Sequence, residues 1–298
     1  MRNRIISFSV DKLEGCCTLS QLIDRTTNDM LLLINLIKFI CLTIPLLSGV
    51  TLAQSPTSTM SHTAKSGQQM QNPLYPKSHV LVTYNANQKL GANSNIKQDE
   101  YMVAPVIPLH LGSNIHLILN PTLTYNRNIS NQQVTNQQQP IQFPSYFTVI
   151  LDKRWFAGIG PYVQTPASNA NNGSRQTGIG ISAGALYAPD NWTIGATMFN
   201  SWGIGNDLSG SSANILNVQP TLSYTSDHAW TYNLSSQMNF NYTARNATNQ
   251  LTLSGGKTVK LLDYHVSFQL GPTYMVTTTP TSAKGFGAYL GVSIKSAQ

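Results

Sequence analysis

The feature that most constrains this chain is a period-two alternation of apolar and polar residues, which recurs along most of the sequence after residue 77. In residues 230–242 one parity carries mostly aromatic and aliphatic side chains, and the other carries Thr, Asn, Ser and Gln. Residues 115–125, 216–224 and 262–276 alternate in the same way. Because successive side chains of a β-strand point to opposite faces, the pattern predicts strands with one apolar and one polar face.

The alternation predicts about twelve strands. They cover residues 78–86, 99–110, 114–127, 145–153, 155–165, 177–188, 191–204, 213–226, 229–243, 249–261, 262–276 and 284–295. Short and long connections alternate along the chain, and the predicted long ones are 87–98, 128–144, 166–176, 205–212, 244–248 and 277–283. An up-and-down barrel has short periplasmic turns and longer external loops. We therefore predict an all-β fold, a transmembrane up-and-down antiparallel β-barrel. A soluble β-sandwich gives no reason for the alternating loop lengths.

Two further features concern the predicted membrane-facing side. The Gly255-Gly256 pair predicts a β-bulge, because Lys257 would otherwise share the parity that faces lipid. Aromatic residues near the predicted strand ends fit the girdles that flank the apolar band of such barrels. These residues are Tyr101, Tyr125, Trp155, Tyr187, Trp192, Trp202, Tyr224, Trp230 and Tyr264.

The N-terminal region predicts export. Residues 30–47 are apolar apart from Lys38, and small residues lead up to Ala53. This pattern is typical of a secretory signal peptide, with cleavage after Ala53. Residues 1–53 are thus predicted to be a leader that is removed, with Met30 as an alternative start. A single transmembrane anchor is the alternative, but the lysine and the small residues favour cleavage.

Residues 54–77 are rich in Ser, Thr, Gln and Pro and show no period. We predict a disordered periplasmic extension there, with a short plug or a partner-binding tail as the alternative. No change in composition divides the rest of the chain, so residues 78–298 are predicted to form one barrel domain.

Composition excludes several classes of function. All three cysteines, Cys16, Cys17 and Cys41, precede the predicted cleavage site, so the mature chain has no disulfide and no thiolate metal ligand. The formal net charge is +7, but lysine and arginine are scattered rather than clustered, which argues against nucleic-acid binding. A modest preference for anions is the simpler interpretation. The histidines lack metal-ligand spacing, and we expect neither a metal nor another cofactor.

Four short motifs resemble those of a known family. They are Ala104-Pro105-Val106-Ile107-Pro108-Leu109, Phe156-Ala157-Gly158-Ile159-Gly160-Pro161 leading to Thr165-Pro166-Ala167, Asn191-Trp192-Thr193-Ile194-Gly195-Ala196 leading to Asn200-Ser201-Trp202, and Asn217-Val218-Gln219-Pro220 leading to Tyr224. In these segments the chain resembles the Gram-negative outer-membrane proteins labelled "neuromedin U" or transporter, near the phenol-degradation MetA-pathway barrels. The label implies no hormone activity.

The resemblance implies an outer-membrane barrel with a transport role, with membrane lipid and the barrel-assembly machinery as partners and no catalytic residues to carry over. The C-terminus departs from the family. Such barrels resemble one another in ending on an aromatic residue that the assembly machinery reads, whereas this sequence ends in Lys295-Ser296-Ala297-Gln298. Tyr289 or an internal signal is then expected to serve instead.

The polar parity of the strands predicts the lumen lining. The candidates are Asn120, Thr122, Asn217, Gln219, Thr221, Asn233, Gln237, Asn239, Asn241, His265 and Gln269. Uncharged groups of this kind replace hydration hydrogen bonds without imposing a strong field. The predicted function is a passive channel or transporter for small polar or weakly anionic solutes.

Two alternatives remain open. A closed structural barrel would meet other molecules through the Asn/Gln-rich loop 128–142. A barrel lipid hydrolase would use Ser267 with His265 as its base, but neighbouring same-face positions place their Cβ atoms nearly 7 Å apart, and the sequence offers no clear partner to orient the base. We therefore predict that the protein is not an enzyme.

Six glycines share the lumen parity of three successive predicted strands. They are Gly158, Gly160, Gly178, Gly180, Gly184 and Gly195. They do not form a nucleotide-binding G-x-G-x-x-G loop. They predict either close packing of the strands or a smooth patch of wall approached by a loop, the N-terminal extension or a solute.

Overall fold

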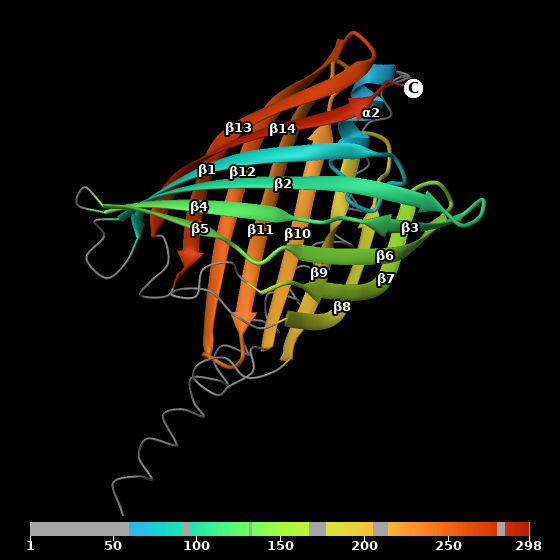
Figure 1. The fold of residues 1–298 in the computed structure, drawn as a ribbon. Coiled ribbons are helices and arrows are strands. Elements are labelled where there is room, and N and C mark those ends of the chain that lie inside the picture. The colour runs from blue at the N-terminus through green and yellow to red at the C-terminus, as the bar shows by residue number, and fades with distance from the viewer. Residues whose placement is uncertain are drawn as a thin grey trace, which may run out of the picture. The chain divides into compact units, whose positions relative to one another are not determined.

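The computed structural model describes residues 60–90, 96–130, 133–166, 177–204, 214–278 and 284–297. The leader predicted for residues 1–53 and its cleavage site after Ala53 lie outside these ranges. The described chain consists of one helix followed by fourteen strands (Figure 1).

The strands form one closed antiparallel sheet. Its elements are the helix α2 (His62–Met70) and the strands β1 (His79–Leu90), β2 (Ile96–His110), β3 (Ile115–Leu119), β4 (Leu123–Ser130), β5 (Gln133–Gln138), β6 (Gln142–Leu151), β7 (Trp155–Gln164), β8 (Thr177–Tyr187), β9 (Trp192–Ile204), β10 (Asn214–Thr225), β11 (Trp230–Asn241), β12 (Asn246–Leu261), β13 (Tyr264–Thr277) and β14 (Gly285–Ser296). Except at β3/β4 and β5/β6, strands that are neighbours in sequence pair with each other, and β1 pairs with both β2 and β14. The predicted up-and-down antiparallel barrel is confirmed.

At two of the twelve strand positions around the barrel, the strand is broken into two segments. The first half of β2 pairs with β4 and its second half with β3, while β4 pairs with β5 and β3 with β6. Both breaks lie at one level, where Thr122 bridges to Gln142. Pro121 and Pro140 flank this bridge, and proline cannot donate to a sheet ladder. The twelve predicted strands therefore appear as fourteen segments.

The predicted alternation of loop lengths is wrong at two connections. The loop expected at 128–144 is mostly a hairpin, in which Ile129 pairs with Val134 and only residues 131–132 connect β4 to β5. At the same end of the barrel, β11 and β12 are joined by residues 242–245 alone. Residues 134–136 are exposed and largely polar, so no lipid-facing parity marks this extension in the sequence.

The bulge predicted at Gly255-Gly256 is also wrong. These residues pair in continuous register with β11 and β13, and the irregularity of β12 lies at Asn249 and Gln250 instead. Lys257 does take the outward parity, as the alternation requires. Its ammonium group lies 5.3 Å from the centre of the Trp230 ring, near the strand end, where a long side chain reaches the membrane interface.

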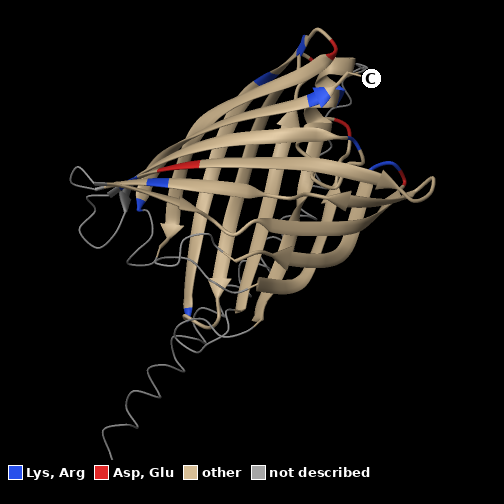
Figure 2. Cartoon of the chain, viewed as in Figure 1, with Lys and Arg blue, Asp and Glu red and all other residues tan. Residues whose placement is uncertain are grey.

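The outer face of the barrel is an exposed apolar surface. Leucine, isoleucine, valine and phenylalanine point outward along β1, β2, β6–β8 and β10–β14. Aromatic pairs mark one edge of this surface, with Trp155 stacked on Tyr187 and Trp192 tilted against Tyr224. Tyr101, packed between Tyr84 and Tyr125, marks the other edge. Figure 2 shows the charged residues near the strand ends, with the wall between them uncharged. This is the profile of a wall that faces hydrocarbon.

Within the described ranges, the helix α2 is not long and apolar enough to cross a membrane.

Candidate functional site: the barrel interior and its N-terminal segment

The N-terminal segment lies inside one end of the barrel. Disorder was predicted for residues 54–77, and this prediction is wrong for residues 60–77, which form α2 and a following turn. Ser61 caps the helix by accepting a hydrogen bond from the Ala64 amide. The sequence concealed the helix because its residues are polar and small, so they carry no amphipathic stripe that period analysis would detect.

Polar contacts fix α2 against the short turns of the wall. The Ser61 hydroxyl donates to the Asp227 carbonyl at 3.0 Å, in the turn between β10 and β11. The Gln68 amide donates to the carbonyls of Asp190 and Trp192 at 2.7 and 2.9 Å, where β8 turns into β9. These are the short turns that an outer-membrane barrel places on its periplasmic side.

A second polar chain links the segment to the last strand. The Lys295 ammonium donates to the Gln69 side-chain oxygen, and the Gln69 amide donates to the Tyr75 hydroxyl at 2.6 Å. Burial raises the pKa of Tyr75, while the hydrogen bond from Gln69 lowers it. The His62 ring lies 5.2 Å from that of His265, so the start of α2 also faces β13.

An apolar core anchors the turn that follows α2. The Asn72 side chain accepts a hydrogen bond from the Leu74 amide at 2.9 Å and so shapes this turn. Leu74 is completely buried, and burying a leucine stabilises a fold by about 1.5–3 kcal/mol. Its cluster consists of wall residues that point inward: Val106, Ile118, Tyr146, Phe156 and Leu186.

Glycine allows the segment and the wall to approach closely. A Cβ atom on Gly67 of α2 would lie 2.6 Å from the Thr258 hydroxyl oxygen, which no real side chain tolerates without movement. On the wall, a Cβ atom on Gly184 would lie 3.1 Å from the Leu74 side chain. Of the two interpretations of the lumenal glycines, Gly184 therefore fits the smooth patch approached by the N-terminal segment. Gly160 and Gly180 meet neighbouring strand backbone and fit close packing.

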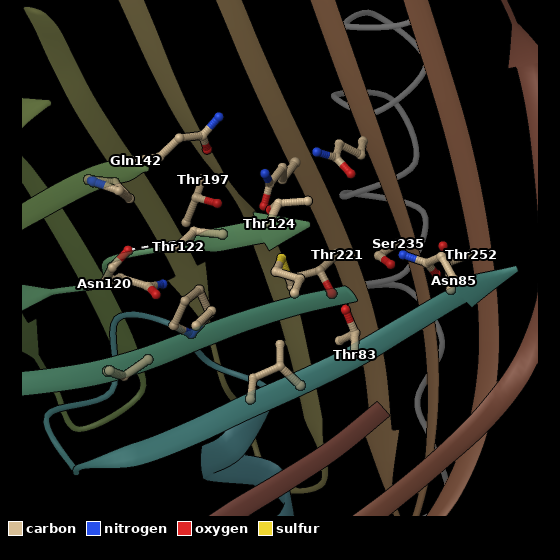
Figure 3. Close-up of a pocket in the computed structure, with 18 of the residues that line it drawn as sticks. Thr83, Asn85, Asn120, Thr122, Thr124, Gln142, Thr197, Thr221, Ser235 and Thr252 are labelled. Carbon is tan, nitrogen blue, oxygen red and sulfur yellow. Dashed lines mark hydrogen bonds between the residues drawn. The ribbon is translucent and has the colours of Figure 1, made fainter. Parts of the chain in front are cut away.

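Beyond this segment the barrel holds a cavity of about 480 Å³. Met70, Gln71 and Pro73 bound it on the side of α2, and wall residues from β1 round to β14 line the rest. Figure 3 shows hydroxyl and amide side chains directed into the cavity from the surrounding strands. Those it labels are Thr83, Asn85, Asn120, Thr122, Thr124, Gln142, Thr197, Thr221, Ser235 and Thr252.

The residues predicted from sequence to line the lumen fall into two groups. The following line the cavity: Asn120, Thr122, Gln219, Thr221, Asn233, Gln237 and Gln269. The other four, Asn217, Asn239, Asn241 and His265, are on the inward parity but do not line it. The lining also includes residues that the sequence reasoning missed, among them Glu100 and Met102 on β2 and Tyr289 on β14. The alternation along each strand indicates that these residues point inward, but it does not show that they line the same cavity.

Some inward side chains form hydrogen bonds with one another, including several that line the cavity. Asn217 donates to Asn239 at 2.5 Å and accepts from Gln219 at 2.8 Å, and Thr221 donates to Asn233 at 3.1 Å. These bonds join β10 and β11 and stiffen one part of the wall.

The arrangement of Ser267 and His265 does not support a hydrolase. Both side chains are buried at 1% exposure, and neither the serine hydroxyl nor either histidine nitrogen has a hydrogen-bond partner among the described residues. A serine nucleophile requires a base within hydrogen-bond reach. The described ranges also contain no group of three His, Cys, Asp or Glu side chains placed to hold a metal ion.

No protein-family model matches the sequence, and no curated protein matches it. Among solved structures, an outer membrane channel from Pseudomonas putida F1 is similar to this chain, with a TM-score of 0.56 and 13% identity over 73% of this chain and 95% of that chain. The NanC porin has a TM-score of 0.47 and 12% identity over 74% of this chain and 98% of its own.

These comparisons support the outer-membrane barrel that the resemblance of the sequence motifs implies. At these identities the likeness speaks to the fold alone. The described part of this chain is a closed β-barrel of the kind found in bacterial outer membranes.

Proposed function

We infer that the protein is a passive outer-membrane channel for small polar solutes, with its short-turn end occupied by residues 60–78. The observation that carries this proposal is a cavity that many hydroxyl and amide side chains line, inside an apolar outer wall. Hydroxyl and amide groups replace the hydration of a solute without a strong field. The resemblance to solved channels points the same way, and so does the resemblance of the motifs to the "neuromedin U" transporters.

The proposal includes its cellular setting. We propose export by the predicted signal peptide, insertion by the barrel-assembly machinery and residence in the outer membrane of a Gram-negative bacterium. The barrel fold and the predicted leader support this setting.

The weakly anionic solutes of the sequence prediction have less support. Among the described residues that line the cavity there is no lysine or arginine, so the proposal is restricted to polar solutes.

A large side chain inside the barrel tests the channel. Ser235 lines the cavity, and its neighbour Leu234 points outward. We expect Ser235→Trp to lower single-channel conductance in planar bilayers by at least about twofold, because it fills part of a narrow lumen. Leu234→Trp is the matched control and should conduct as the unmodified protein does. Absence of conductance steps from correctly folded protein would contradict the proposal.

A closed structural barrel is the second candidate, favoured by the interlocked amides of β10 and β11. It would act through the external hairpin of β4 and β5, which takes the place of the predicted loop 128–142. In that case the protein would show no conductance, and shortening the hairpin would abolish binding of a surface partner while the barrel still folds.

A further inference from the structure

Three inward side chains form a row across adjacent strands of the cavity wall. Asn85 of β1 is paired directly with Glu100 of β2, and Glu100 is paired directly with Asn126 of β4. All three line the cavity, on the part of the wall nearer the long connections. On the far side of Asn85, its partner on β14 is Tyr289, which also lines the cavity. A carboxylate and two amides therefore share one level of the barrel, and the ring of the adjacent tyrosine lies against Gly291.

The two amide oxygens of this row lack donors among the described residues. Asn85 donates through its nitrogen to Glu100 at 2.9 Å, but its side-chain oxygen has no partner. Asn126 is 7% exposed and its side-chain oxygen is unpartnered. One layer below, Thr83 is 3% exposed and its hydroxyl oxygen is unpartnered as well. Buried acceptors are normally satisfied by a donor, so this row offers a place for a ligand that donates hydrogen bonds.

The charge of the row is also uncompensated. Within the described part of the chain, the cavity lining contains no basic side chain other than His79, and the one hydrogen bond to the Glu100 carboxyl group comes from Asn85. Ionisable groups inside a membrane protein are costly and usually mark a solute or ion pathway. The neighbouring layer is already satisfied, because Gln98 donates to Asn128 at 3.1 Å.

We propose that Asn85, Glu100 and Asn126 form a binding site for the ammonium group of a small organic cation. One carboxylate matches one positive charge, whereas calcium takes six or more oxygen ligands, usually with several carboxylates. An ammonium group supplies donors to the amide oxygens. The ring of Tyr289, which lies against Gly291 on the same strand, lines the same cavity. This site would determine which solutes the proposed channel carries, so the inference rests on the proposed function.

Glu100→Gln tests the site, because it removes the charge and keeps the size. The matched control is Asp99→Asn, which removes one charge from the opposite face of the same strand, where Tyr84 donates to Asp99 at 2.9 Å. Reversal potentials in a potassium chloride gradient should show cation preference in the unmodified protein and in Asp99→Asn. We expect the preference to fall about fivefold to tenfold in Glu100→Gln, since a charge acts strongly in a low-dielectric wall.

The ligand class is tested with 2-aminoethanol hydrochloride and with ethylene glycol, its neutral analogue. We expect 2-aminoethanol to reduce the potassium current of the unmodified protein and of Asp99→Asn, and to leave Glu100→Gln unaffected. Asn126→Leu keeps the charge but removes an acceptor, so its current should need a higher concentration for the same reduction. An unchanged concentration in Asn126→Leu would argue against the site even if Glu100→Gln failed to fold.

The outcomes separate this inference from the channel itself. Current without cation preference, or equal behaviour of Glu100→Gln and the unmodified protein, overturns the site and leaves the channel standing. A protein with no current overturns the channel. The site is then decided by thermal unfolding in detergent, where 2-aminoethanol should protect the unmodified protein more than ethylene glycol does. Equal protection, or protection that persists in Glu100→Gln, would overturn the site.

Discussion

Deleting residues 60–77 is expected to raise the single-channel conductance at least about twofold, because a helix with its side chains is about 10 Å across and occupies much of a narrow lumen. The segment closes one side of the cavity with Met70, Gln71 and Pro73. Planar-bilayer recording measures the effect, and circular dichroism shows whether the barrel still folds. Unchanged conductance in a folded deletion variant would mean that the segment does not obstruct the path.

A cross-link provides the complementary measurement. A Cβ atom on Gly67 would lie 3.3 Å from the Cβ atom of Thr258. Disulfides need about 3.5–4.5 Å between these atoms, so a small shift is enough. The three natural cysteines precede residue 54, so a protein produced without the predicted leader offers no competing thiol. The double variant Gly67→Cys/Thr258→Cys should oxidise readily and keep its conductance low. Each single variant serves as control, and failure to oxidise would contradict the docking of α2.

Leu234→Arg is expected to destabilise the barrel by about 2–4 kcal/mol, the cost of an arginine on a lipid-facing strand at the bilayer midplane. Leu234 is 44% exposed, points outward from the middle of β11 and is paired with Leu222 and Leu253. Equilibrium unfolding in lipid vesicles measures the change. The effect arises because the charge must leave water or distort the bilayer.

Leu262→Arg is the matched control. Leu262 lies in the turn between β12 and β13, has φ +52° and is 89% exposed. The same substitution there places the charge in water or at the headgroups. We therefore expect the free energy of unfolding to change little compared with Leu234→Arg. Equal destabilisation by the two variants would show that the outer wall does not face hydrocarbon.

The sequence predicted the number of strands and the direction of their side chains well. Both depend on a local property, the alternation of side chains along one strand between lipid and water. It failed where that contrast disappears. Residues 134–136 of β5 are exposed on both faces of the strand, so the hairpin of β4 and β5 was taken for a loop. Asn120 and Gln219, which were expected to face inward for the same local reason, line the cavity.

The tertiary structure alone decided what fills the barrel. Gln68 finds its partners at Asp190 and Trp192, more than a hundred positions away, and nothing in its own neighbourhood encodes that contact. The row of Asn85, Glu100 and Asn126 likewise exists only through the register of three strands. The period-two pattern fixes which face a residue occupies, whereas register and long-range docking fix which residues meet, because these depend on closing the whole sheet.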